Sequence, residues 1–132
     1  MARVRDNSKR CFEFDEYATG FHVYRDVWEP QPDEILECHL DKGNVHDKHA
    51  LGIFKNGALV GHAPRGVARY CSKAILLGAV VTFKVKDGTY CNLRHNGLEV
   101  AGTYQMYGRD GYLNVIIRLL KDFLRRSENK KK

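Results

Sequence analysis

Short runs of alternating apolar and polar residues account for most of the chain. In 79–86 (AVVTFKVK), Val81, Phe83 and Val85 occupy every second position, which is the period of a strand with one buried face. Similar runs predict the other strands, at 17–25, 34–40, 49–55, 58–62, 98–107 and 112–119. Many short strands within 132 residues indicate a mainly β fold, either a small barrel or a sandwich.

Turn signals separate these runs. Asn-Gly and Asp-Gly pairs readily adopt the positive φ angles of a two-residue hairpin. The chain contains four such pairs, at 56–57, 87–88, 96–97 and 110–111. We therefore expect a tight hairpin turn at each of these pairs.

One segment has helical rather than strand periodicity. Segment 65–77 (RGVARYCSKAILL) places apolar side chains on one face and three basic side chains on another. Pro64 suits the start of a helix, and Gly78 suits the position just past its end. We expect an OB-like small β-barrel capped by this one inserted helix, and such barrels often bind single-stranded nucleic acid.

The expected boundaries follow from these elements. We divide the chain into a basic N-terminal arm (1–14), the folded domain (15–120) and a basic C-terminal tail (121–132). Segment 119–126 has apolar residues that could instead form a short helix, and the sequence leaves both interpretations open.

Charge is distributed unevenly around the net value of +6. Segment 11–41 carries nine acidic residues against one basic residue, whereas 42–118 carries eleven basic residues against four acidic ones. A basic half and basic ends favour a polyanionic partner such as nucleic acid, although charged ends also serve solubility alone. The same basic ends suggest a nuclear, or otherwise intracellular, protein.

Several classes of protein are not indicated. No apolar run approaches the ~18 residues that span a bilayer, so we expect no membrane association. The four cysteines lack paired C-x-x-C spacing, so we expect reduced thiols, with Cys71 in the core. No nucleophile, P-loop or zinc-protease motif occurs. We therefore expect a binding module rather than an enzyme, without a metal or another cofactor.

Segment 41–65 concentrates the candidate chemistry. Its polar residues from Asn44 to His49 precede a strand, where Asn and Asp commonly stabilise turns. A metal site is a second interpretation, but neighbouring residues of an extended chain point to opposite faces. His62 and Arg65 flank the predicted helix start, where free N–H groups attract phosphate. They could equally be a capping histidine and a solvated cation.

Aromatic residues are abundant, and most of them should fill the core. One or two could instead stack on bases, each contributing about 1–3 kcal/mol. Trp28 lies in an expected loop, either as an exposed anchor for a partner or as a cover folded back on the barrel.

Three motifs stand out along the chain, namely the aromatic strand at 20–24 (GFHVY), the block at 40–51 with its Asn-x-x-Asp-x-x-Ala-Leu core, and the turn at 60–65 (VGHAPR). Together they resemble the HIRAN domain, a DNA-end-binding family. The resemblance covers about residues 17–118. The chain departs from the family pattern at Val23, Val45 and His46, where an aromatic residue, Pro and Tyr are usual.

The resemblance implies an OB-like barrel that recognises single-stranded DNA with a free 3′-hydroxyl, in DNA repair or replication-fork processing. It also implies roles for ten residues. Those bordering the terminal base would be His22, Val23 and Tyr24. Those holding the end would be Asn44, His46, Asp47 and Lys48, with Asp47 accepting a hydrogen bond from the 3′-hydroxyl. Those meeting the backbone phosphate would be His62 and Arg65, and a late strand would supply Tyr112.

Two other functions remain open from the sequence. The first is a protein-interaction module of the same fold, which docks other DNA-processing proteins through the barrel edge or the Trp28 loop. The acidic stretch at 11–41 slightly favours it. The second is a small metal-dependent hydrolase, with His46, Asp47 and His49 as candidate ligands.

Overall fold

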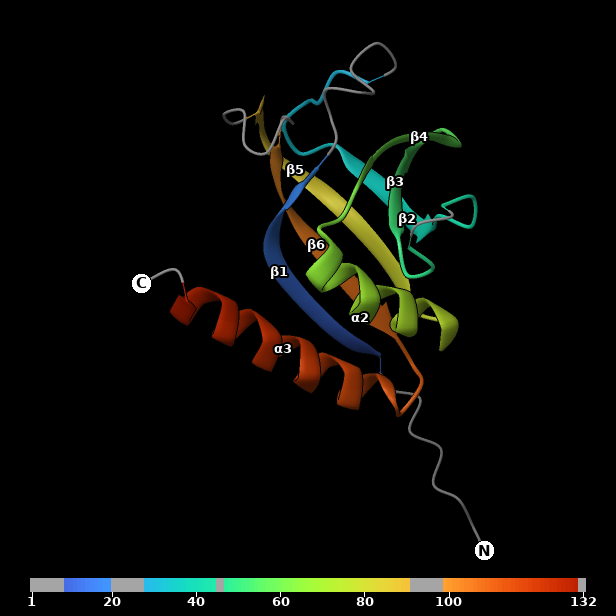
Figure 1. Cartoon of the computed structure of the whole chain (residues 1–132). Coiled ribbons are helices and arrows are strands. Elements are labelled where there is room, and N and C mark those ends of the chain that lie inside the picture. Colours follow the sequence, from blue (N-terminus) through green and yellow to red (C-terminus); the bar gives the residue numbers. More distant parts are fainter. Residues whose placement is uncertain (1–8, 20–27, 45–46, 91–98, 131–132) are drawn as a thin grey trace, which may run out of the picture.

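A six-stranded antiparallel sheet forms the body of the molecule in the computed structural model of the chain (Figure 1). The structure describes residues 9–19, 28–44, 47–90 and 99–130. The strands are β1 (Arg10–Ala18), β2 (Ile35–Leu40), β3 (Leu51–Lys55), β4 (Ala58–His62), β5 (Val80–Tyr90) and β6 (Val100–Gly108). The helices are α2 (Arg65–Leu76) and α3 (Leu113–Lys130). The predicted mainly β class is therefore confirmed.

The strand order is β1-β6-β5-β2-β3-β4, so the two edges of the sheet are β1 and β4. The sheet is not closed along its length, but its edges meet at one point. There the amide of Thr19 donates to the carbonyl of His62 over 2.8 Å, and the amide of His62 donates back over 3.1 Å. This bridge curls the sheet into an open, barrel-like shape.

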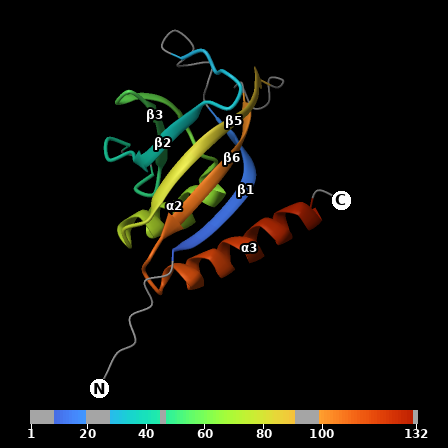
Figure 2. The same cartoon turned by 180° about the vertical axis from the view of Figure 1, so that it is seen from behind.

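The inner side of the curled sheet is apolar and carries α2. Figures 1 and 2 show from opposite sides that α2 lies against one face of the sheet, while α3 runs alongside β1. The largest fully buried side chains come from several strands and from α3, namely Tyr104, Phe83, Leu51, Ile53, Met106, Leu113 and Leu120. Tyr104 stacks on Phe14, and its hydroxyl donates to the carbonyl of Tyr17 over 2.9 Å. The core thus joins α3 to β1 and β6.

Local signals correctly predicted two features. Asn56 and Gly57 have φ angles of 51° and 83°, as a two-residue hairpin between β3 and β4 requires. Helix α2 follows Pro64, and Gly78 has a φ of 87° just past its end.

Cys71 is fully buried on the inner face of α2, as expected, and burial raises its pKa to about 12.

The strand and hairpin predicted around 110–119 are wrong. The carboxylate of Asp110 accepts the amide of Tyr112 over 2.8 Å, and its carbonyl accepts the amide of Leu113, which together start α3. The β-branched run at 115–117 favours a strand locally, but Leu113, Ile117 and Leu120 are buried at helical spacing. The helix continues through most of 121–132, which was expected to be a tail.

A second expected hairpin is also absent. Strand β5 continues through Asp87-Gly88, and its pairing with β6 is irregular between Val85 and Tyr90. The fourth expected turn, at 96–97, lies outside the described residues.

Trp28 is the folded-back cover rather than the exposed anchor. Its side chain is buried, and its indole N–H donates to Glu34 over 3.0 Å. The other carboxylate oxygen of Glu34 lies 2.9 Å from the ammonium of Lys55. Burial raises the pKa of Glu34, but the hydrogen bonds from Lys55, Trp28 and the Gln31 amide outweigh it and lower the pKa below its usual 4.5.

This carboxylate predicts a pH dependence of stability. A carboxyl group with a lowered pKa in the folded state stabilises the fold above its unfolded pKa, and that contribution is lost as the pH falls. We expect the free energy of unfolding to decrease below pH 4.5, measured by denaturant titration. Glu34→Gln should weaken this decrease, whereas Glu37→Gln, on an exposed side chain of β2, should preserve it. Equal acid sensitivity in all three proteins would contradict the assignment.

Gly102 in the interior strand β6 predicts a sharp packing limit. A Cβ atom there would lie 2.3 Å from the Phe83 ring and 2.5 Å from the carbonyl oxygen of Lys84. Because the second contact is to backbone, Gly102→Ala should destabilise the protein by about 1–3 kcal/mol in chemical denaturation. Gly111→Ala, whose Cβ would meet nothing within 4 Å, is the matched control and should cost less than about 0.5 kcal/mol.

Candidate functional site

The segment between β2 and β3 forms a compact polar turn. The side-chain oxygen of Asn44 accepts the amide of Asp47 over 3.1 Å, and Oδ1 of Asp47 accepts the amide of His49 over 2.9 Å. These bonds are the turn-stabilising role that Asn and Asp commonly play. They also fix the direction of the Asp47 carboxylate, which is only 20% exposed.

The chain returns to this turn at the end of β4. After His62 has paired with Thr19, the amide of Ala63 donates to the carbonyl of Leu51, and Pro64 then leads into α2. Helix α2 has no side-chain cap and no acidic residue in its first turn. Its N-terminus therefore leaves partial positive charge beside the polar turn.

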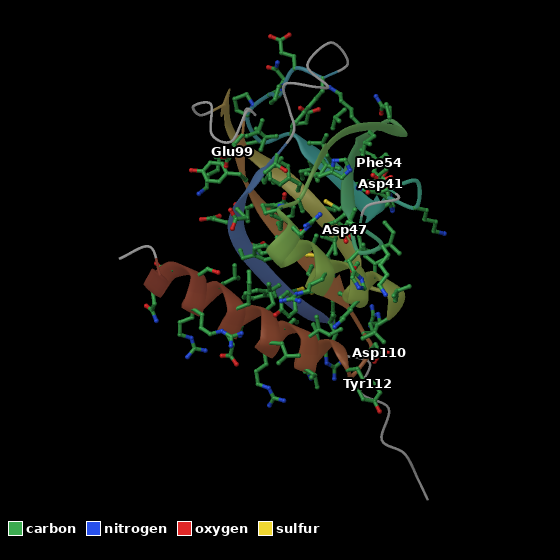
Figure 3. The ribbon with its side chains drawn as sticks, viewed as in Figure 1. Asp41, Asp47, Phe54, Glu99, Asp110 and Tyr112 are labelled. Atoms are coloured by element: carbon green, nitrogen blue, oxygen red, sulfur yellow. The ribbon has the colours of Figure 1, made fainter. Side chains whose placement is uncertain are left out.

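Two carboxylates of the turn face two basic side chains from this return. Oδ2 of Asp41 lies 2.8 Å from Nε2 of His62, and Oδ2 of Asp47 lies 3.6 Å from Nε of Arg65. Asp41 and His62 are both mostly buried, whereas the Arg65 side chain is 80% exposed. Figure 3 shows Asp41 and Asp47 on the same side of the molecule. The inner pair is a fixed support, and the outer pair opens to solvent.

A pocket of about 400 Å³ opens at the outer pair. Asp47 and His49 line it from the turn, and α2 contributes its first two turns. The residues from α2 are Arg65, Gly66 and Arg69. One carboxylate among cations suits an anionic ligand that also carries a hydroxyl, because a carboxylate repels phosphate but accepts a hydrogen bond from O–H.

The structure brings together part of the predicted site. Asn44, Asp47, His62 and Arg65 come together around the turn and the start of α2, with Lys48 exposed between Asp47 and His49. The predicted residues His22, Val23, Tyr24 and His46 lie outside the described ranges. The Nε2 atom of His62 is held by Asp41, so a phosphate would have to compete with that carboxylate for it.

Tyr112 does not join this group. It is 72% exposed at the start of α3 instead of lying on a late strand, and Figure 3 shows it near Asp110, away from Asp41 and Asp47. Because this segment forms the start of α3 and not a strand, Tyr112 lies apart from the polar turn.

Sequence reasoning overlooked three residues of this region, although signals for two of them were present. Asp41 begins the polar segment, but its pairing with His62 depends on the distance between the β2 and β4 ends. Arg69 was placed on the basic face of the expected helix together with Arg65, but it was not assigned to the site. His49 was considered only as a metal ligand, whereas it lines the pocket. Across the described ranges, no group of three or more His, Cys, Asp or Glu residues is arranged to hold a metal ion.

Comparison with known proteins identifies the fold. The chain is similar to the crystal structure of the HIRAN domain of human HLTF, with a TM-score of 0.66 and 18% sequence identity over 84% of this chain and 88% of that one. It is also similar to a protein from Lactobacillus plantarum, with a TM-score of 0.51 and 13% identity over 74% of this chain and 98% of that one. No family model matches the chain, and no curated protein matches its sequence. The HIRAN resemblance is thus confirmed for the fold.

The Asp41–His62 pair predicts a measurable coupling energy. Both side chains are mostly buried, so a double-mutant cycle with Asp41→Asn and His62→Ala should give about 1 kcal/mol in thermal or chemical unfolding. The exposed pair Asp33–Lys84, at 3.8 Å, is the control and should give below about 0.5 kcal/mol. Equal coupling in the two cycles would show that Asp41 does not hold His62.

Proposed function

We propose that the chain is a nucleic-acid-binding module that binds single-stranded DNA at its 3′-hydroxyl end, without catalysis, in DNA repair or replication-fork processing. The observation that carries this proposal is the carboxylate of Asp47 lying 3.6 Å from the guanidinium of Arg65 at an open pocket. The HIRAN-like fold and the basic composition of 42–118 support it. In this proposal the folded domain is the part of the chain that binds, and a nuclear location follows from the ligand.

The roles of the polar groups follow from their chemistry. Asp47 accepts the terminal hydroxyl through Oδ2, because Oδ1 already accepts the amide of His49. Arg65 binds the adjacent phosphate with a planar, always charged fork, next to the uncapped N-terminus of α2. His62, oriented by Asp41, donates to the same phosphate only after exchanging its present partner. Asn44 supports the turn through its bond to the Asp47 amide, and Lys48 adds positive charge beside it.

A carboxylate at this position gives selectivity rather than affinity. A strand that continues past this point, or ends in phosphate, would place negative charge against Asp47. A free hydroxyl donates a hydrogen bond to the same oxygen and is accepted. The proposed site therefore distinguishes an end from the middle of a strand by one charge.

The experiment is a titration of labelled single strands that end in 3′-hydroxyl or 3′-phosphate. We expect a preference for the hydroxyl end of at least about tenfold, equivalent to about 1.4 kcal/mol. Asp47→Asn should reduce this preference to about twofold or less, because Asn can still accept the amide of His49 while its side chain carries no charge. Fluorescence anisotropy at fixed salt measures both affinities.

The control for that variant is Asp110→Asn. Asp110 also accepts a backbone amide through its carboxylate, at the start of α3 and away from the pocket (Figure 3). Its substitution should leave the preference unchanged. Equal affinity of the unmodified protein for both ends would refute end recognition, and no binding at low salt would refute the DNA proposal as a whole.

Docking of a protein partner is the second candidate function. The Trp28 loop does not support it, because Trp28 is buried, but α3 exposes an apolar flank formed by Tyr112, Val115 and Leu119. These side chains are 72%, 40% and 48% exposed. Binding of a protein partner that persists after nuclease treatment and in high salt would favour this function over DNA binding. That binding should be lost in the double variant Val115→Glu/Leu119→Glu.

A further inference from the structure

The exposed face of α2 carries a regular row of cations. Arg65, Arg69 and Lys73 follow one another at four-residue intervals, and all three are exposed. Four residues of helix rise by about 6 Å and turn by about 40° more than one revolution. The row therefore follows the helix as a slowly turning line, with a step similar to the distance between neighbouring phosphates of an extended single strand.

Two members of this row, Arg69 and Lys73, have no acidic partner among the described residues, and Arg65 is paired only with Asp47 at the pocket. Several cations elsewhere lie beside carboxylates, in the pairs Lys55–Glu34, Lys84–Asp33, Lys86–Asp15 and Arg125–Asp122. Helix α2 contains no Asp or Glu, and within the described residues neither Arg69 nor Lys73 forms an ion pair. The guanidinium of Arg69 lies 5.4 Å from the centre of the Tyr70 ring. That ring is neutral, and among the described residues no carboxylate balances the charge of Arg69.

The row is continuous with the proposed end-binding site. Arg65 faces Asp47, and Arg69 lines the same pocket from the next turn of the helix. A strand whose terminal hydroxyl lies at Asp47 and whose first phosphate lies at Arg65 would meet Arg69 next and Lys73 after it. A strand that left the pocket in another direction would not contact the unpaired cations Arg69 and Lys73.

We propose that the bound strand continues along α2, with Arg69 and Lys73 each neutralising one further phosphate. This proposal rests on the proposed function and extends it from a terminal nucleotide to a strand of several nucleotides. The 3′ end lies at the turn, and the strand runs in the 5′ direction toward the C-terminal end of α2. These contacts are made to the phosphates of the DNA backbone, so they add affinity without distinguishing one base sequence from another.

Oligonucleotide length and salt dependence test this path. The probes are 3′-hydroxyl oligothymidylates of about two and about six nucleotides, within or below the size range of OB-type sites. Each phosphate contact on a single strand contributes about 0.7 to the slope of log affinity against log salt. Arg69→Ala/Lys73→Ala should therefore make the slope for the longer probe shallower by about 1.4. Between 50 and 200 mM salt, that is about a sevenfold smaller loss of affinity.

The shorter probe separates the path from the end site. Its affinity should be unchanged within about twofold in the double variant, because it reaches only Asp47 and Arg65. Circular dichroism and thermal unfolding confirm that the variant is folded. A salt slope for the longer probe that equals that of the unmodified protein would overturn the proposed path.

The matched control is Arg118→Ala. Arg118 is an exposed cation of α3, five positions before Phe123, the residue whose ring packs against Tyr70 of α2. It therefore points about 140° around the helix from that contact. A shallower slope in this control as well would show a general field effect and overturn the path.

The two proposals fail in different ways. Suppose that the 3′-hydroxyl and 3′-phosphate probes bind equally but the salt slope for the longer probe is still shallower in the double variant. The path then holds and end recognition fails. If the end preference persists but the slope does not change, the path fails and end recognition holds. If neither probe binds the unmodified protein, both proposals fail.

Discussion

The backbone bridge between Thr19 and His62 is the constraint on which the rest of the structure depends. It joins the two edges of an open sheet by paired amide–carbonyl hydrogen bonds. Because β4 ends at this bridge, the chain must leave the sheet there, and α2 begins after only two intervening residues. The start of α2 therefore lies beside the turn that holds Asp47. One pair of backbone bonds thus connects sheet curvature to the geometry of the pocket.

The site combines a rigid support with an exposed contact surface. Asp41 and His62 are mostly buried and hold each other at 2.8 Å, whereas Arg65 is exposed and only loosely paired with Asp47 at 3.6 Å. Exposed ion pairs contribute little to stability, so Arg65 can change partner at small cost. Breaking the inner pair would leave partly buried polar groups unsatisfied. This difference suits a binding site in which the scaffold stays fixed and the outer cation exchanges a carboxylate for a ligand.

Sequence reasoning succeeded where a few neighbouring residues decide the structure. Asn56-Gly57 and the Pro64–Gly78 limits of α2 are determined locally, and both were predicted. It failed at α3, because Val115, Ile116 and Ile117 favour a strand while burial of Leu113 and Leu120 requires a helix. The Asp47–Arg65 proximity came from the family resemblance and the motif spacing. The Asp41–His62 pair could not be predicted, since it depends on how β2, β3 and β4 pair in space.

The order of the strands has a consequence for how the molecule is made. Strand β1 pairs only with β6 along its length, with Arg10 opposite Gly108, so nearly a hundred residues separate the partners. During synthesis β1 emerges early and remains without a neighbour until β6 has left the ribosome. The β2–β3–β4 part, whose pairings are local, can form before that. Closing so long a loop is slow, so we expect docking of β1 to be the late step in folding.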